Sequence, residues 1–104
     1  MRPAASRRSP AAKRADPLLA LRNIGPAARA DLRLLGIDTP AQLAEREPDA
    51  LYRELARRTG ARHDPCVWDV FAAAIHEART GEALAWWRFT PLRKARQARG
   101  EFPG

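Results

Sequence analysis

Cys66 and His63 have side chains able to ligate a metal ion or to act together as a nucleophile and its base, and they stand three positions apart. His76 is the other histidine of the chain. A structural zinc site needs a complete tetrahedral set of ligands, and nucleophilic catalysis needs an oriented base. The sequence completes neither arrangement. Cys66 and Val70 share a helical face, so a buried structural thiol is the favoured interpretation. Redox chemistry and metal binding remain the alternatives.

The segment LRNIGP at residues 21–26 separates two short helical patterns. Asn23 and Gly25 break the first helix because Asn and Gly tolerate left-handed backbone angles, and Pro26 suits the first turn of the second. This pattern resembles a helix-hairpin-helix motif, in which small turn residues let backbone N–H groups of the second helix approach a DNA phosphate. The resemblance implies these nucleic-acid-binding residues: Arg22, Asn23, Gly25, Ala27, Ala28, Arg29 and Arg33.

Within this resemblance, Ile24 is the apolar plug between the two helices and Gly25 is the point of closest approach to a phosphate. The free amides of Ala27 and Ala28 are the expected donors. Asn23 stands where the motif has its first glycine, and Ala27 stands where many DNA-binding examples have a lysine. In the alternative interpretation, the hairpin only packs against this domain or against a partner helix.

The segment WWRF at residues 86–89 contains two of the three tryptophans, and Trp68 is the third. Aromatic rings beside Arg88 are able to stack on nucleic-acid bases. A domain of ~70 residues, however, has difficulty burying enough surface, and large aromatic side chains help to close its core. We therefore predict that Trp86 or Trp87 packs in the core.

Proline and glycine positions divide the chain into helical segments. The expected segments are 17–22, 26–35, 40–46, 48–59 and 65–79, with a short helix or extended cover at 82–89. Asp-Pro and Thr-Pro pairs are typical of helix starts, and Gly36, Gly60 and Gly81 are typical of helix ends. No segment has the alternating pattern of a strand. The sequence predicts an all-α bundle of about five helices.

The formal net charge of +7 lies at the two ends of the chain. Residues 1–16 have five basic side chains and one carboxylate, and residues 88–104 have the same numbers. Residues 17–87 have nine arginines and ten carboxylates. We expect a disordered basic arm over 1–16, a helical domain over 17–90 and a basic tail over 91–104. The alternative is that the basic ends only aid solubility.

Several classes of protein are excluded by the composition. A single cysteine allows no disulfide within the chain, so a reducing compartment is expected. No apolar stretch approaches the ~20 residues of a membrane span. The arginines near the start are followed by no apolar segment of a secretory signal. These features predict a cytoplasmic protein.

A broader resemblance covers about residues 17–92. It depends on the following segments: 32–37, 39–43, 48–52, 64–67, 69–71 with Ala74, and Gly81 with 86–89. Together they resemble the pathogenicity-locus family, small helix-hairpin-helix proteins often labelled mitomycin resistance proteins. The LRNIGP segment is also similar to the C-terminal domain of the TfoX competence regulators. The resemblance implies a DNA-binding fold of the SAM-like class with no established catalytic activity.

The sequence therefore predicts a protein that binds nucleic acid, duplex DNA foremost, through its phosphate backbone and with little sequence preference. The contacts would come from the hairpin and the basic arms. We expect no enzyme activity, cofactor or metal. The alternative function is a protein-interaction adaptor, in which the hairpin and the surface of Trp86 and Trp87 engage a protein partner without nucleic acid.

Overall fold

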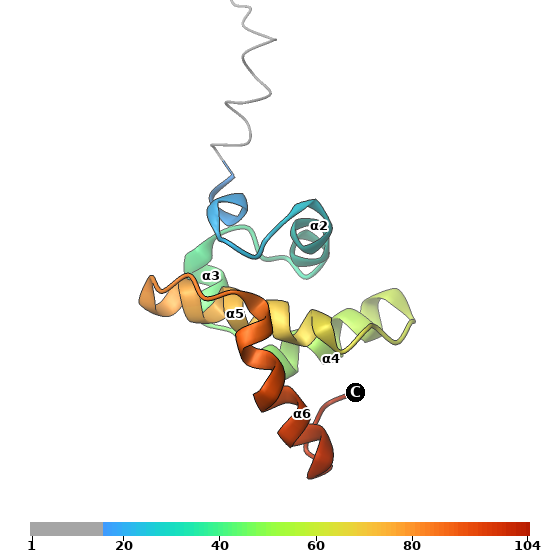
Figure 1. Ribbon diagram of the computed structural model, residues 1–104. Helices are drawn as coiled ribbons and strands as arrows, with labels where there is room; N and C mark the ends of the chain where they lie inside the picture. Colours follow the sequence, from blue (N-terminus) through green and yellow to red (C-terminus); the bar gives the residue numbers. More distant parts are fainter. Residues whose placement is uncertain (1–15) are drawn as a thin grey trace, which may run out of the picture.

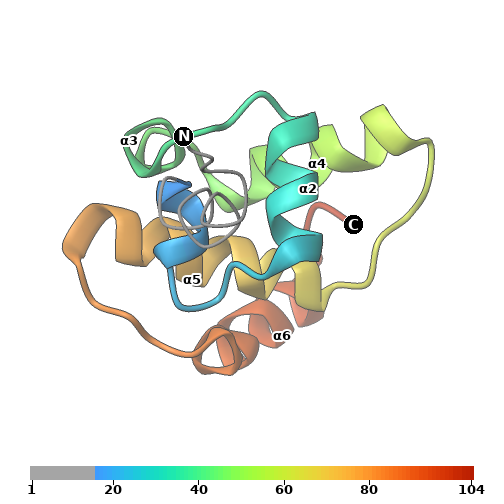
Figure 2. The same cartoon turned by 90° about the horizontal axis from the view of Figure 1, so that it is seen from above.

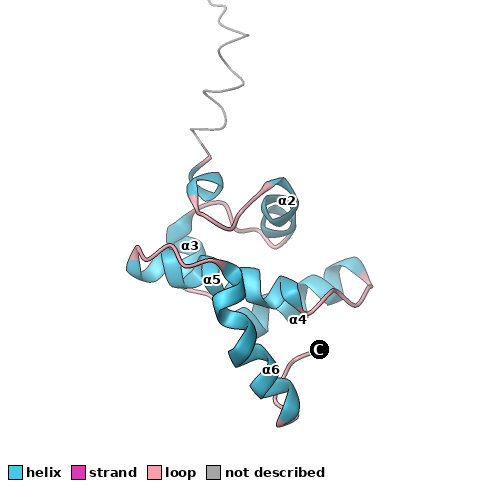
Figure 3. Ribbon diagram, viewed as in Figure 1, coloured by secondary structure: helices cyan, strands magenta, loops and turns pink. Residues whose placement is uncertain are grey.

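The computed structural model describes residues 16–104, so all of the predicted basic arm except Asp16 lies outside the described residues. The described part of the chain consists of helices joined by turns and short connections (Figure 3). The all-α prediction is confirmed. Within these same residues, no helix is both long and apolar enough to cross a lipid bilayer.

Residues 16–104 form five α-helices and two short 3-10 helices (Figure 1). The α-helices are α2 (Pro26–Leu34), α3 (Pro40–Ala44), α4 (Pro48–Thr59), α5 (Cys66–Thr80) and α6 (Thr90–Ala98). The 3-10 helices are η1 (Pro17–Ala20) and η2 (Trp86–Phe89). The predicted boundaries of α2, α3, α4 and α5 agree with these to within two residues.

The helix ends follow the capping chemistry expected from the sequence. The Asp16 carboxylate accepts a hydrogen bond from a backbone amide of η1 at 3.2 Å. Thr39 and Gln42 form a reciprocal capping box at the start of α3. Gly60 and Gly81 end α4 and α5 with left-handed φ angles of 67° and 81°. Only glycine adopts such angles without strain, which explains why both helices stop there.

Helix α5 lies at the centre of the fold. It packs against α3, α4 and η2, and η1 and α2 lie side by side above it (Figure 2). The core contains these fully buried side chains: Leu18, Leu32, Leu43, Leu51, Leu55 and Phe71. η1 and helices α2 to α5 each contribute one or two of these apolar anchors, and α5 packs against the anchors of the others. This packing fixes the position of the turn between η1 and α2.

The fold continues past residue 90, where the sequence suggested that a basic tail begins. Asp69 of α5 is completely buried, and Arg93 of α6 donates to its two oxygens at 3.0 and 3.1 Å. The Thr90 hydroxyl also donates to Asp69, at 2.7 Å. A buried carboxylate is costly unless it is paired and hydrogen-bonded, so α6 is required to complete the core.

A second contact holds the C-terminal segment against α4 and α5. The guanidinium of Arg96 donates to both oxygens of Asp49, at 2.7 and 2.8 Å. The indole of Trp68 donates to the same carboxylate at 2.8 Å. The ring of Phe102 then packs against Tyr52 and Trp68, with centroid distances of 5.3 and 6.1 Å. Some of the basic residues near the end of the chain, Arg93 and Arg96, therefore have a structural role.

Replacing Arg93 with alanine should destabilise the protein by about 3–5 kcal/mol, because Asp69 would be left buried without its charged partner. Urea unfolding followed by circular dichroism measures this loss. Lys94→Ala is the matched control, since Lys94 is the neighbouring exposed cation of α6 and its loss should change stability by less than about 0.5 kcal/mol. Equal stability of the two variants would show that α6 is not part of the cooperative fold.

Candidate nucleic-acid interface

The N-terminus of α2 is open. Gly25 is its N-cap and provides no side-chain cap, and Pro26 has no N–H. The amides of Ala27 and Ala28 have no hydrogen-bond acceptor among the described residues. At α3, by contrast, the Thr39 hydroxyl accepts from the amide of Gln42, which occupies the position equivalent to Ala28. Free N–H groups at a helix start, together with the helix dipole, favour an anion.

The backbone at Gly25 is exposed but has a different conformation from the one expected. Its φ of −95° and ψ of −172° are those of an extended residue, so the expected left-handed angle is wrong at this position. A Cβ placed on Gly25 would have no atom within 4 Å. The absent side chain therefore leaves the backbone uncovered but is not required by the turn. Ile24, by contrast, is 4% exposed and fills the space under the turn as predicted.

A groove of about 440 Å³ lies against this helix start, and we call it the α2 groove. Its lining residues are Asp16, Leu19, Ile24, Gly25, Pro26, Arg29 and Arg33. The charged side chains among them are two arginines and one aspartate, so the lining has a net positive charge. The groove thus lies between the start of α2 and the arginines of that helix.

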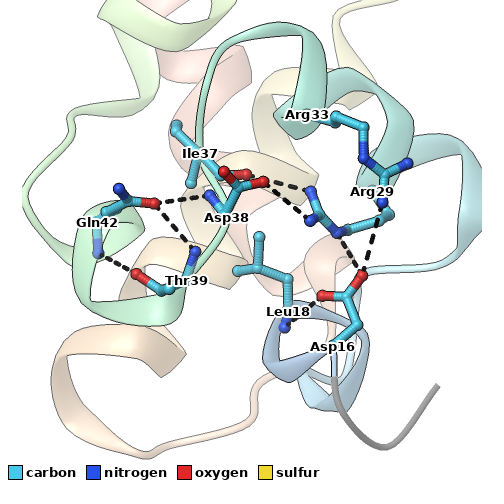
Figure 4. A network of polar contacts seen from close by, with 8 residues as sticks. All are labelled: Asp16, Leu18, Arg29, Arg33, Ile37, Asp38, Thr39 and Gln42. Carbon is cyan, nitrogen blue, oxygen red and sulfur yellow. Dashed lines mark hydrogen bonds and ion pairs between the residues drawn. The ribbon is translucent and has the colours of Figure 1, made fainter. Parts of the chain in front are cut away.

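Arg29 is not a free cation, contrary to the prediction for this residue. Its guanidinium is buried and donates to Asp16 at 2.7 Å, to the Ile37 carbonyl at 3.2 Å and to Asp38 at 3.2 Å (Figure 4). The hydrogen bond with Arg29 lowers the pKa of Asp16. All of these contacts are within the protein. Arg29 therefore joins the start of η1, α2 and the loop before α3, and it does not present its charge to a ligand.

Arg33 lies one helical turn after Arg29 and is the arginine of α2 that faces solvent. Its side chain is 65% exposed, and its nearest carboxylate oxygen, on Asp16, is 3.9 Å away. That carboxylate is already bound by Arg29 at a shorter distance. Arg33 therefore keeps its hydrogen-bond donors available at the edge of the α2 groove.

Arg22 and Asn23 form hydrogen bonds with the segment that leads into η2. The Asn23 side chain donates to the Leu84 carbonyl at 2.7 Å and accepts from the Trp86 amide at 3.0 Å. Arg22 donates to the Ala83 carbonyl at 2.9 Å. These contacts attach the loop before η2 to the turn before α2. Asn23 therefore acts as a positioning residue here, which the predicted phosphate contact did not anticipate.

The three tryptophans have different environments. Trp68 is buried in the core, Trp86 is half-buried and Trp87 is 57% exposed. Of the two tryptophans predicted as alternatives for the core, Trp87 lies outside it and Trp86 is partly buried. The two neighbours could not be distinguished in the sequence, because the exposure of each depends on how η2 docks on α5 and on Asn23.

Cys66 is half-buried at the start of α5, with its sulfur 3.7 Å from the nearest Arg93 nitrogen. Burial, followed by the hydrogen bond with Asp64, raises the pKa of the thiol. A raised pKa disfavours the thiolate that nucleophilic or redox chemistry needs. Among residues 16–104, no three His, Cys, Asp or Glu side chains lie close enough to hold a metal ion.

Comparisons with known proteins identify the family to which the chain belongs. The sequence model of the family described as Pathogenicity locus matches residues 11–95. A relative named Mitomycin resistance protein McrB, from Streptomyces lavendulae, is 36% identical over 77 residues, which cover 74% of this chain and 73% of the relative. No solved structure matches the chain. The similarity to TfoX regulators stays a prediction.

Replacing Arg29 with leucine should lower stability strongly, by about 3–5 kcal/mol, because Asp16 loses the partner that compensates its partial burial. Arg33→Leu removes the same charge from an exposed position of the same helix, and we expect its stability to stay within ~0.5 kcal/mol of the parent. Thermal unfolding of both variants distinguishes the structural arginine from the free one. An unstable R33L beside a stable R29L would reverse these assignments.

Acid should destabilise the protein as the pH falls below about 4. Arg29 lowers the folded pKa of Asp16 from its ordinary value of 3.8, so the unfolded chain binds the proton first as the pH falls. The stabilisation is complete above pH 3.8 and is lost as the pH drops through the folded value. Melting temperatures of the parent and Asp16→Asn across this range measure the effect. We expect a shallower acid dependence in D16N, and parallel curves would contradict it.

Proposed function

The chain belongs to the pathogenicity-locus family, and we propose that it is a cytoplasmic, non-enzymatic protein that binds nucleic-acid phosphates with little sequence preference. In this proposal, η1, the turn and α2 act as a helix-hairpin-helix unit. The observation that carries it is the uncapped start of α2, where two amides lack partners within residues 16–104. A phosphate oxygen is the acceptor that this geometry favours.

The charge distribution supports the same proposal. Asp16 lines the α2 groove, and residues 1–15 join the fold there with five basic side chains and no carboxylate. Arg33 adds an exposed cation at the groove edge. A phosphate bound at α2 would thus have the most basic part of the sequence covalently attached beside it. Contacts to phosphate through backbone and arginine carry no base information, so we expect weak sequence preference.

A second candidate function is a protein-interaction adaptor. The observation in its favour is a groove of about 590 Å³ formed by α4, α5 and the start of α6. Trp68, Ile75 and Phe89 provide apolar lining, and the half-exposed Leu92 stands at its edge. None of these residues belongs to the α2 groove, so the two candidate functions depend on different side chains.

Glutamate at Ala27 should weaken binding to a DNA duplex about tenfold or more, because the new carboxylate competes with phosphate for amides whose charge-assisted hydrogen bonds contribute ~1.5–3 kcal/mol. Fluorescence anisotropy of a labelled duplex measures the affinity. Folding should not suffer, since an acidic residue in a first helical turn is favoured by the dipole.

Ala41→Glu is the matched control for A27E. Both alanines follow a proline at the start of a helix and both are exposed, but the amides at Ala41 belong to a helix that Thr39 already caps. The two variants have the same net charge, so long-range repulsion is equal. Equal affinities would show that the start of α2 does not contact phosphate.

Deleting residues 1–15 should reduce the slope of log affinity against log salt concentration by up to about 4.5, because five basic side chains are lost and each neutralised phosphate contributes ~0.9. Titrations of the full chain and the truncated chain at several salt concentrations give both slopes. The truncation is made only at the N-terminus, since α6 belongs to the core. An unchanged slope would assign the arm to solubility.

A further inference from the structure

Trp87 presents an aromatic face to solvent. The residue is 57% exposed, and its ring meets that of Trp86 at 5.7 Å between centroids with an angle of 82° between planes. In an edge-to-face pair, an edge of one ring meets a face of the other, so at least one face of Trp87 remains uncovered by Trp86. Tryptophan is enriched at interfaces, because its ring offers a large apolar surface and its N–H a hydrogen-bond donor.

The backbone that carries Trp87 is held on both sides. The amide of Trp86 donates to Asn23 at 3.0 Å, and Ala85 before it is buried. After η2, the Thr90 hydroxyl donates to the buried Asp69 at 2.7 Å. Trp87 is thus an exposed ring on an ordered support, which lowers the entropic cost of stacking against a ligand.

The same contacts place Trp87 near the open start of α2. Asn23 stands two residues before Gly25 and is hydrogen-bonded to the residue before Trp87. Gly25 is two residues after Asn23, and Trp87 is one residue after Trp86. These three Cα–Cα steps, added to the span of the hydrogen bond between Asn23 and Trp86, put the Cα atoms of Gly25 and Trp87 within about 20 Å of each other. A few nucleotides of an extended strand cover that distance. Arg88, also exposed, follows Trp87 directly.

The carboxylates near this surface have partners of their own. Glu77 accepts from the Arg22 backbone amide at 2.9 Å, and Glu82 lies 2.7 Å from the His76 ring nitrogen. The exposed Arg88 has no carboxylate within salt-bridge distance among the described residues. An exposed cation beside a tryptophan face suits a nucleotide, which has both a π face and a phosphate.

We propose that Trp87 stacks on an unpaired base of a single-stranded nucleic acid whose phosphate binds at the start of α2. This inference rests on the proposed function and narrows it, because a base inside a duplex has no free face to offer. The affinity gained should depend little on base identity, since every base has a π face. It also assigns Trp87 to nucleic acid and leaves the groove at Leu92 for any protein partner.

The test compares labelled single strands of about 12 nucleotides, thymidine DNA and uridine RNA, with a blunt duplex of the same length, each titrated into the full chain. Trp87→Ala should weaken single-strand binding about five- to 150-fold, the range for one stacked base, and leave duplex binding unchanged. Trp87→Phe, which keeps a π face, should restore part of the loss. Leu92→Ala is the control, because Leu92 is similarly exposed but lies in the other groove.

An abasic strand separates stacking from general contact. The parent protein should bind this strand as weakly as W87A binds the normal strand, and W87A should show no further loss on it. DNA and RNA single strands both support stacking, and the ratio of their affinities identifies the preferred sugar.

Two results would overturn the inference in distinguishable ways. If the parent binds the duplex in an A27E-sensitive manner but W87A does not change single-strand binding, stacking is wrong and the proposed function stands. If the parent binds neither strand nor duplex, both fail together. A W87A variant that loses duplex and single-strand binding equally also rejects stacking.

Discussion

The burial of Arg29 is the constraint on which the candidate interface depends. Its guanidinium must find acceptors inside the protein, and it finds them on Asp16, on the Ile37 carbonyl and on Asp38. These groups belong to the start of η1 and to the loop after α2, so one side chain fixes both segments against the helix. Asp16 also caps η1 by accepting from the Leu18 amide. The amides at Ala27 and Ala28 stay open because the N-cap of α2 is Gly25, which has no side chain to accept from them.

Arg93 is a second buried arginine that joins separate segments, here α6 and α5 through Asp69. A domain this small buries limited apolar surface, and here buried arginine–carboxylate pairs join elements that short helices alone would hold weakly. Such pairs are costly to break rather than strongly stabilising in themselves. They specify which helix docks where. They also mean that net charge overstates how many cations face solvent, because Arg29, Arg93 and Arg96 are committed within the protein.

The sequence predicts helix positions well because they are local. A proline in the first turn, a capping Asp or Thr and a terminal glycine act within a few residues, and they place the starts and ends of α2 to α5 nearly correctly. The site is less predictable because its contacts are distant in sequence. Asn23 binds the amide of Trp86, 63 positions away, and Arg93 reaches Asp69 across 24. A polar residue in a turn and a basic residue near the end of the chain gave no local signal of either role. The adjacent residues Trp86 and Trp87 are likewise identical in type but differ in exposure.

Asn23 illustrates why the turn and η2 should be considered together. Its amide group both donates and accepts, so it fixes the position and the direction of the passing segment in a way that a glycine at this position could not. With asparagine in place of glycine, the turn has less backbone freedom, but the Asn23 side chain connects it to the segment before η2. That bridge sets the spacing between an open helix start, suited to a phosphate, and an exposed indole, suited to a base. A nucleotide chain has these two groups in alternation. The groove of α4, α5 and α6 shares no lining residue with the α2 groove, so a protein partner there would leave the α2 groove free.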